Sequence, residues 1–560
     1  MAPRLASQFC AEVDTALHNA DPLKLQSILV LEPPFGPIYQ QLIAELRADY
    51  PASDETADAR LEDVVRTTVT ETAETEDAEG RPVQNWAAMT TFLAGWMSFI
   101  RDVDVENLLT TYEALSDLQQ KVNTALQHPT KGILVLPTLI AYANVFARVA
   151  VGLDRRPELV EHLVAATVTE EGGRESLAEK AANVIRQAFV TCLNDKNTVP
   201  GGIKGGRPDG KKIGVYKTAN VCLKILFQTN KLDNCPMIFK NITASSPPLH
   251  FYPAADRVTY LYYLGRHQFI SDDFYQAQLI LQKAYEECAV DSSCSKQRRL
   301  IFRYLLLANF MLGRFPTEEA YSRAEAKGLR PIFQPLVRAI RKGDLESFRR
   351  ITSLDLTYEH VNVLLRWGVF YKIRSCTEVL VWRSLFRKVF MLTGQQQGVT
   401  ERSAPTLDLK AVLAATLYFE KRARMTPGMA QASSDPRRHT AFAILDFATH
   451  DNYVDPDFDG LDLKPCEHVP DVMEIECICG SLIMQSLLHG YISHKQSKFA
   501  IQGAKRAGSA VKAGFPVPWQ VFEKRNLEAG RDEVLGWVKD MQSAGASQVV
   551  RLAGARPAGS

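Results

Sequence analysis

The stretch with the clearest suggestion of chemistry is GGIKGGRPDGKK at residues 201–212, which contains most of a phosphate-binding loop. Gly205, four further residues, Gly210 and Lys211 match G-x-x-x-x-G-K, a pattern whose backbone amides and lysine hold nucleotide phosphates. The complete pattern continues with Ser or Thr to hold magnesium, but this chain has Lys212. The loop must also join a strand to a helix, whereas the residues before it have helical spacing. We therefore expect a flexible connection between two helices, not a nucleotide site. Its basic residues are expected to add surface charge: Lys204, Arg207, Lys211 and Lys212.

Two other clusters resemble metal sites but lack what a metal needs. The sequence DPDFDG at 455–460 opens like a calcium-binding loop, but Cys466 stands at the twelfth position, where a bidentate Glu is required. Cys466, His468, Cys477 and Cys479 suggest zinc. However, residues two apart on a helix point about 200° away from each other and cannot hold one ion together. An acidic loop and buried free thiols are the expected explanations, and no metal or other cofactor is predicted.

The most informative charge pattern lies near the end of the chain. Ile478–Phe522 contains no Asp or Glu, although the overall composition predicts about five. The segment Arg366–Lys388 adds six basic residues against Glu378 alone. Basic side chains beside a helix can follow a phosphate backbone, with little sequence preference. The alternatives are a solvated basic face or a surface for an acidic protein. The residues predicted to contact nucleic acid are Lys495, Lys498, Lys505, Arg506, Lys512, Arg383, Arg387 and Lys388.

Composition and length indicate the class of protein that carries these side chains. The chain has 560 residues, 46% hydrophobic and 23% charged, with a net charge of +1, which is typical of soluble protein with several domains. Net charge therefore indicates no particular partner. The N-terminus lacks a secretory pattern, and ten dispersed cysteines suggest reduced thiols inside the cell. The apolar run at 132–147 is short for a membrane span and contains Pro137, so it is expected to be a buried helix.

Hydrophobic spacing of three and four predicts that helices dominate. Within 256–288, Gly265 is followed by Ala277, Leu281 and Ala284, offsets that resemble a tetratricopeptide-like helix pair; an unrelated helical hairpin is the alternative. Near the C-terminus, two helical patterns precede HGYISHKQSKFAIQ, which predicts a two-strand hairpin.

This order predicts an all-α helical-repeat arm followed by a winged-helix domain with a small β-hairpin wing. Residues from Ser543 onward are expected to be disordered. The predicted segments are N-terminal helices at 1–50, an acidic linker at 51–80, the arm at 81–335, the winged-helix region at 336–503 with an insertion at 421–469, and a basic tail at 504–560. For the acidic range, a loosely held helix is the alternative to a solvated linker.

Five stretches give a more specific resemblance. They are LEPPF (31–35), DRVTYLYYLGRHQFISDDFYQAQLILQKAYEEC (256–288), RLIFRYLLLANFMLGRFPT (299–317), LFRKVFML (385–392) and LLHGYISHKQSKF (487–499). Together they resemble PCI-domain proteins, in particular the branch that holds the PCI subunit of the second transcription-and-export (TREX) complex and the signalosome-associated subunit twelve. The resemblance covers roughly 210–420 and 470–503 well. It is loose over the N-terminal third, and the 201–212 loop, the insertion and the tail depart from it.

The resemblance implies a non-catalytic adaptor. Such a subunit pairs with a large scaffold subunit, binds a small acidic disordered lid protein, and presents a winged helix to RNA and DNA. It also implies a nuclear location at the envelope or pore, with some protein in the cytoplasm, a role in mRNA export, and no membrane contact. The alternative is a signalosome- or splicing-associated scaffold with a purely protein-protein role. An enzyme that hydrolyses nucleotides is the third and weakest hypothesis.

Overall fold

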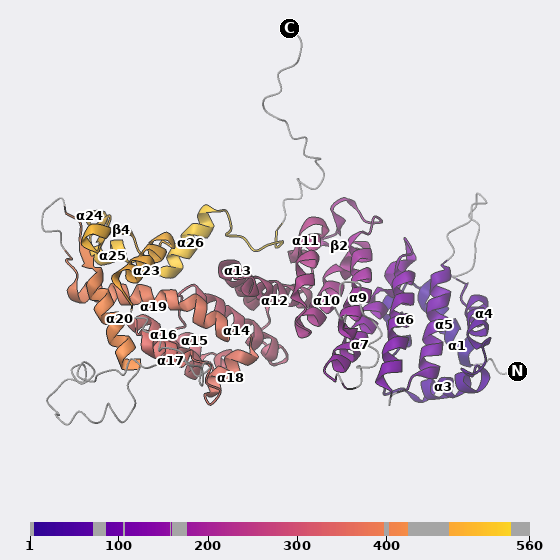
Figure 1. Ribbon diagram of the computed structural model, residues 1–560. Coiled ribbons are helices and arrows are strands. Elements are labelled where there is room, and N and C mark those ends of the chain that lie inside the picture. Colours follow the sequence, from indigo (N-terminus) through magenta and orange to yellow (C-terminus); the bar gives the residue numbers. More distant parts are fainter. Residues whose placement is uncertain are drawn as a thin grey trace, which may run out of the picture. The chain divides into compact units, whose positions relative to one another are not determined.

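Helices dominate the computed structural model, which describes residues 5–70, 86–104, 107–156, 158, 176–396, 403–423 and 470–538 (Figure 1). Two compact units are present. The first comprises Met1–His267, Lys283–Ala289 and Glu533–Ser560, and the second comprises Gln268–Gln282 and Val290–Asp532. The boundary falls inside the range expected to be a single arm, so helices of that range contribute to both units.

The first unit is a succession of helices, of which α5, α6, α7, α9 and α10 pack on one another in chain order (Figure 1). Large aromatic side chains fill its core, including the fully buried Trp86, Trp96 and Phe146. Local sequence defines the helix starts: Ser176 accepts a hydrogen bond from the Glu179 amide at 3.2 Å and so begins α9. The helices are α1 (Leu5–His18), α2 (Pro22–Ile28), α3 (Pro37–Asp49), α4 (Ala57–Thr68), α5 (Ala87–Asp102), α6 (Leu108–Leu126), α7 (Leu136–Asp154), α9 (Leu177–Leu193), α10 (Val215–Gln228) and α11 (Cys235–Ser245).

Part of the range expected to be an acidic linker is packed helix. Helix α4 buries Ala57, Leu61 and Val65, which lie four residues apart on one face, and it contacts α1 and α5. Of the two alternatives for this part, a solvated linker and a loosely held helix, the structure shows a helix, because a narrow apolar stripe among the acidic residues is enough to dock it. Residues 71–80 of the expected linker lie outside the described residues.

The apolar run forms α7 and the short 3-10 turn before it. Within the described residues, Lys131–Asp154 is the one helical stretch long and apolar enough to cross a membrane, and half of its most apolar window is buried inside the protein. Helix α7 contacts α2, α6, α9 and α10. Burial among neighbouring helices is what the sequence predicted for this segment.

The second unit has a longer central helix, α19 (Phe370–Thr393), against which α16, α17 and α20 pack. The structure also contains α12 (Ala254–Ile270) and α13 (Phe274–Glu287), the two helices of the predicted pair, and each has residues in both units. The remaining helices are α14 (Ser295–Met311), α15 (Glu318–Ser322), α16 (Arg330–Lys342), α17 (Leu345–Ile351), α18 (Glu359–Arg366), α20 (Leu409–Ala423), α23 (Val472–Met484), α24 (Ala504–Ala507), α25 (Ala510–Gly514) and α26 (Pro518–Glu528).

A three-stranded antiparallel sheet completes the second unit. Its order is β3–β5–β4, with β3 at Thr406–Asp408, β4 at Gly490–Ser493 and β5 at Lys498–Ile501. The predicted hairpin is therefore confirmed, with Tyr491 opposite Ala500 and Ile492 opposite Phe499. Gly490 is needed there because a Cβ atom would lie 2.1 Å from the Ala500 carbonyl oxygen.

The predicted basic tail is folded over its first part. Helices α24, α25 and α26 occupy 504–528, and Ala510 and Phe515 are buried. The expectation of a separate tail was wrong here because Phe515 packs on Phe390 and Phe499, with ring centroids 5.5 and 6.4 Å away. The segment from Ser543 onward lies outside the described residues, as do residues 424–469 of the insertion expected at 421–469. Residues 421–423 of that range end α20.

An ion network ties the end of α20 to the start of α17. Arg422 donates to Asp344 at 2.6 Å and to Glu346 at 2.8 Å. Burial alone would raise the pKa of Asp344, but hydrogen bonds from Arg422 and Ser347 outweigh it and hold this pKa below its ordinary value. A lowered folded-state pKa stabilises the fold above the unfolded value of about 3.9, and the contribution is lost as the pH falls through the folded pKa.

We expect Arg422→Met to lower the free energy of unfolding of the second unit by about 2 kcal/mol at pH 7, because two partly buried carboxylates lose their partner. The difference from the unsubstituted chain should shrink below pH 4, as Asp344 becomes protonated. Urea unfolding at pH 7 and pH 3.5 measures both effects. Arg350→Met is the matched control, since Arg350 pairs with the same Glu346 but its side chain is 66% exposed; an equal effect of the two substitutions would contradict the account.

Candidate functional site

The first group of predicted site residues lies on the hairpin. Lys495 is exposed in the 3-10 turn His494–Gln496 that connects β4 to β5. Lys498 is half-buried in β5, and its register partners are Ser493 and Asp408. Lys495 is therefore free to reach a ligand, whereas Lys498 faces a carboxylate-bearing residue across the sheet.

The second group follows the sheet directly. Lys505 and Arg506 are exposed on α24, and Lys512 is exposed on α25. Arg506 also lines a hollow of about 690 Å³ together with His489, Lys524, Arg525 and Glu528. Within the described residues, no ion pair engages Lys495, Lys505, Arg506 or Lys512. Uncompensated cations of this kind are what a phosphate-binding surface requires.

Arg383 has a different role from the one predicted. Its Nη2 donates to the carbonyl oxygens of Phe515 and Pro516 at 2.8 and 2.7 Å, so it secures the segment between α25 and α26. Burial, with a smaller contribution from Arg387, lowers the pKa of Arg383 to about 10. The guanidinium is still charged at neutral pH, but it is committed to these carbonyl groups. Arg383 is thus a positioning residue for the basic surface and not a free contact.

We expect Arg383→Met to release the segment 515–528, because two charge-assisted hydrogen bonds are lost while the side-chain volume is kept. Hydrogen exchange of the amides in α26 should be faster by roughly one to two orders of magnitude, corresponding to about 1.5–3 kcal/mol. Arg387→Met serves as the control because Arg387 is exposed and lies one turn further along the same helix. Unchanged exchange in α26 after Arg383→Met would show that the segment is secured by other contacts.

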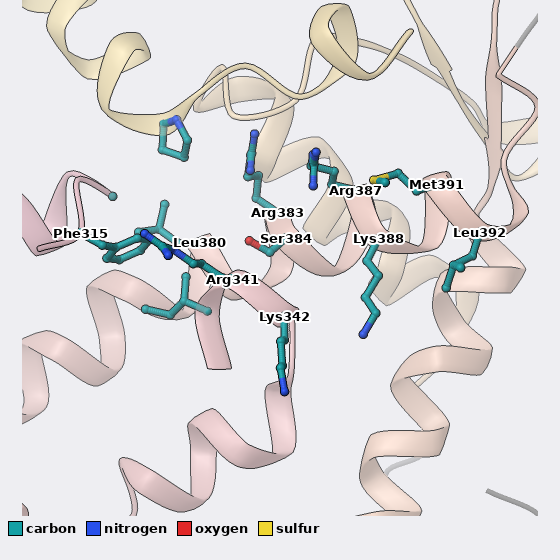
Figure 2. A pocket seen from close by; sticks show the side chains of 13 residues that line it. Phe315, Arg341, Lys342, Leu380, Arg383, Ser384, Arg387, Lys388, Met391 and Leu392 are labelled. Carbon is teal, nitrogen blue, oxygen red and sulfur yellow. The ribbon is translucent and has the colours of Figure 1, made fainter. Parts of the chain in front are cut away.

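Arg387 and Lys388 lie in a groove of about 550 Å³ between α16 and α19 (Figure 2). Arg341 and Lys342, from the last turn of α16, also line it. In Figure 2, Lys342 and Lys388 extend in the same direction, whereas Arg383 and Arg387 extend toward the C-terminal segment. The groove therefore has cations on both sides. Among the described residues, no carboxylate lines the groove. The residues that line it are Gly313, Phe315, Ile340, Arg341, Lys342, Leu380, Arg383, Ser384, Arg387, Lys388, Met391, Leu392 and Pro518.

Sequence reasoning missed four basic residues of this surface: Arg341, Lys342, Lys524 and Arg525. The first two end a helix with a strong apolar stripe, where basic residues in the last turn are ordinary and carry no functional signal. They become informative only when α16 packs against α19 and brings them beside Lys388. Lys524 and Arg525 lie beyond Phe522, where the acid-free stretch ends.

The glycine-containing loop is closed to phosphate. Asp195 Oδ2 accepts the Lys211 amide at 2.9 Å, and Asp209 Oδ2 accepts the Val199 amide at 2.9 Å. Carboxylates thus occupy backbone amides that a phosphate would need, and their charge would repel it. Lys211 is itself only 4% exposed, and burial lowers its pKa. The expectation that Lys211 adds surface charge was wrong, because its side chain is buried and its Nζ donates to the Gln127 carbonyl oxygen at 3.4 Å. The loop itself forms the short β1–β2 hairpin (Ile203–Lys204 and Arg207–Pro208).

The cysteines of α23 have the geometry expected from their spacing. Cys479 is buried, where the surroundings raise the pKa of its thiol to about 12, whereas Cys477 is exposed. Desolvation is the main cause of that shift, with a smaller contribution from Glu476. Over the described part of the chain, no group of three or more His, Cys, Asp or Glu side chains could hold a metal ion. Cys466, His468 and the 455–460 segment lie outside that part.

The class of protein that the sequence stretches and helical fold indicate is the PCI-domain protein, and comparison with known proteins confirms this resemblance. No protein-family model matches the chain. A PCI domain-containing protein of Schizosaccharomyces pombe is 24% identical over 446 residues, which cover 78% of this chain and 85% of that protein. PCI domain-containing protein 2 of Danio rerio is 26% identical over 325 residues, covering 58% of this chain and 63% of the relative.

Protein CSN12 homolog of Neurospora crassa is 24% identical over 335 residues, covering 58% of this chain and 60% of the relative. The chain therefore spans less than two thirds of the length of the latter two relatives. Both members of the branch suggested by the sequence are represented among these names. The likeness supports a scaffold role for this chain.

Proposed function

We propose that this chain is a non-catalytic adaptor of a nuclear mRNA-export complex, in which a winged-helix surface binds RNA or DNA together with a larger scaffold subunit. In this proposal β3, α20, α23 and the β4–β5 hairpin form the winged helix, with the wing tip at Lys495. The strand order β3–β5–β4, and the contact between α20 and α23, support it. A small acidic disordered protein is the second proposed partner, and the proposed location is the nucleus, at the pore.

The observation that carries the nucleic-acid part is the set of exposed, uncompensated cations on the wing, α24, α25 and the α16–α19 groove. Helix α23 is a poor candidate for reading bases, because it carries Glu474 and Glu476 and exposes Met473 and Met484. Glu476 Oε2 also accepts a hydrogen bond from His494 Nδ1 at 2.7 Å, and this contact holds the wing turn beside α23. The proposed contact is therefore made to phosphates and is largely independent of sequence.

A tagged full-length chain recovered from nuclear extract tests the partner part of the proposal. We expect a large scaffold protein and mRNA-export factors to copurify. Ultraviolet crosslinking before the purification tests the nucleic-acid part in the same cells, and labelled RNA should remain on the chain after denaturing washes. Recovery of signalosome or splicing factors without crosslinked RNA would favour the protein-only scaffold and overturn the proposal.

A further inference from the structure

The α16–α19 groove combines a basic rim with an exposed apolar floor. Met391 and Leu392, on the last turn of α19, are 49% and 75% exposed, and Ile340 and Leu380 continue the floor inward. Exposed apolar side chains flanked by cations suit a ligand that carries both phosphates and flat apolar faces. From this combination we propose that the groove holds unpaired nucleotides, so that the surface binds single-stranded nucleic acid in preference to duplex. The inference rests on the proposed function and specifies the ligand of that surface.

The size of the groove favours about one or two nucleotides. Its volume of about 550 Å³ lies within the range of roughly 300–1,000 Å³ that encloses a molecule of a few hundred daltons. A duplex keeps its bases stacked inside and offers phosphates to the rim, so the apolar floor would gain nothing from it. A single strand can place a base on the floor while its phosphates meet Lys342 and Lys388, which extend in the same direction in Figure 2.

One side of the groove provides a stacking surface. The guanidinium of Arg341 lies over the Phe315 ring, 5.7 Å from its centroid. An arginine that packs on an aromatic ring can leave the other face of its guanidinium free, and a base can stack on such a face without regard to sequence. Phe315 itself is half-buried and lines the same groove.

The groove also connects with the rest of the basic surface. Pro518 lines the groove, whereas Pro516 lines the second hollow, which contains Arg506, Lys524 and Arg525. The segment between α25 and α26 therefore lies between the two hollows. Arg383 holds this segment in place by donating hydrogen bonds to the Phe515 and Pro516 carbonyl oxygens. A strand that crosses this segment would find cations on both sides.

An acidic peptide is the competing ligand for a basic and apolar groove. The lining favours a nucleic acid because it combines cations from α16 and α19 with the aromatic ring of Phe315, over which Arg341 lies. A peptide carboxylate can pair with the N–H edge of a guanidinium but gains nothing from an aromatic ring, whereas an unpaired base stacked on such a ring gains about 1–3 kcal/mol. An acidic peptide is therefore compared with RNA in the binding experiment.

The experiment compares binding of the full chain to a labelled 20-nucleotide RNA, to the same sequence as a duplex, and to an oligoglutamate peptide. We expect the single strand to bind about tenfold more tightly than the duplex. The variant M391S/L392S removes exposed apolar surface without changing charge. It should weaken single-strand binding about five- to tenfold, leave duplex binding unchanged and leave the salt dependence unchanged.

The matched control is L354S/L356S, which removes two leucines of the same unit that are 54% and 61% exposed and do not line the groove. It should leave both affinities unchanged. Photocrosslinking with RNA that contains 4-thiouridine should give adducts on groove residues, and the highest yield is expected at Phe315 or Met391. Equal affinity for single strand and duplex, or equal loss of both in M391S/L392S, would overturn the inference while the proposed function stands. Failure of both RNA forms to bind, with binding of the peptide alone, would overturn both.

Discussion

We expect the reversal of four exposed charges, in K495E/K505E/R506E/K512E, to lower RNA affinity by roughly a hundredfold or more at low salt. The physical reason is that each of these side chains is exposed, and none forms an ion pair with another described residue. Each one can therefore release a counterion when it meets a phosphate. Fluorescence anisotropy with a labelled RNA measures the effect, and the slope of log affinity against log salt should fall by about four. Lys498 is left unchanged, because a glutamate there would lie opposite Asp408 in the sheet and weaken the hairpin.

A control with the same change of net charge separates local contact from bulk electrostatics. The variant K24E/K196E/K240E/K296E reverses four exposed lysines that are far apart in the sequence and form no ion pair with another described residue. Its affinity for RNA should fall by less than about threefold, since long-range effects of dispersed charges are screened beyond about 10 Å. If both quadruple variants lose affinity equally, the basic surface has no specific role in binding.

Substituting Gly343 should strongly destabilise the second unit. Gly343 ends α16 in the left-handed conformation, with φ of 65°, and a Cβ atom there would lie 2.5 Å from the Leu385 amide nitrogen and 2.6 Å from its Cα. Both contacts are with the backbone of α19, which cannot move aside alone. We expect Gly343→Ala to lower the free energy of unfolding by about 3 kcal/mol, combining left-handed strain with overpacking. The substitution should also spread the walls of the groove, because Arg341 and Lys342 precede this residue directly.

Gly368→Ala isolates the conformational part of that effect. Gly368 has φ of 70° and follows α18, but nothing lies within 4 Å of where its Cβ atom would be. Its substitution should lower the free energy of unfolding by only about 1 kcal/mol. Denaturant unfolding of both variants gives the comparison. Equal destabilisation would mean that the close approach of α16 and α19 contributes nothing to stability.

Much of the architecture could be predicted because long helices and a hairpin have strong local patterns. Tyr491 and Ile492 precede a polar turn and Phe499 and Ile501 follow it, and the strands form there. The short strand β3 was not predicted, because three residues carry no measurable period and its pairing partner, β5, lies about ninety residues away. Helix α4 was expected only as a loosely held alternative to a linker, because its acidic composition conceals a stripe of three apolar residues.

The candidate site was predictable only in part, for a similar reason. The absence of acidic residues between Ile478 and Phe522 is a local feature, and it correctly located exposed cations on the hairpin, α24 and α25. The role of Arg383 depends on carbonyl groups 132 and 133 residues further along the chain, so no local pattern contains it. The contribution of Lys342 likewise requires the packing of α16 on α19.

Binding of the purified full chain to a labelled single-stranded RNA, measured between 50 and 300 mM salt, tests the central claim most directly. The account predicts binding at low salt, with log affinity falling linearly against log salt at a slope that indicates about four to eight phosphate contacts. It also predicts that the slope is the same for unrelated RNA sequences. Absence of binding at 50 mM salt, or an affinity that does not change with salt, would contradict the claim that this surface binds a phosphate backbone.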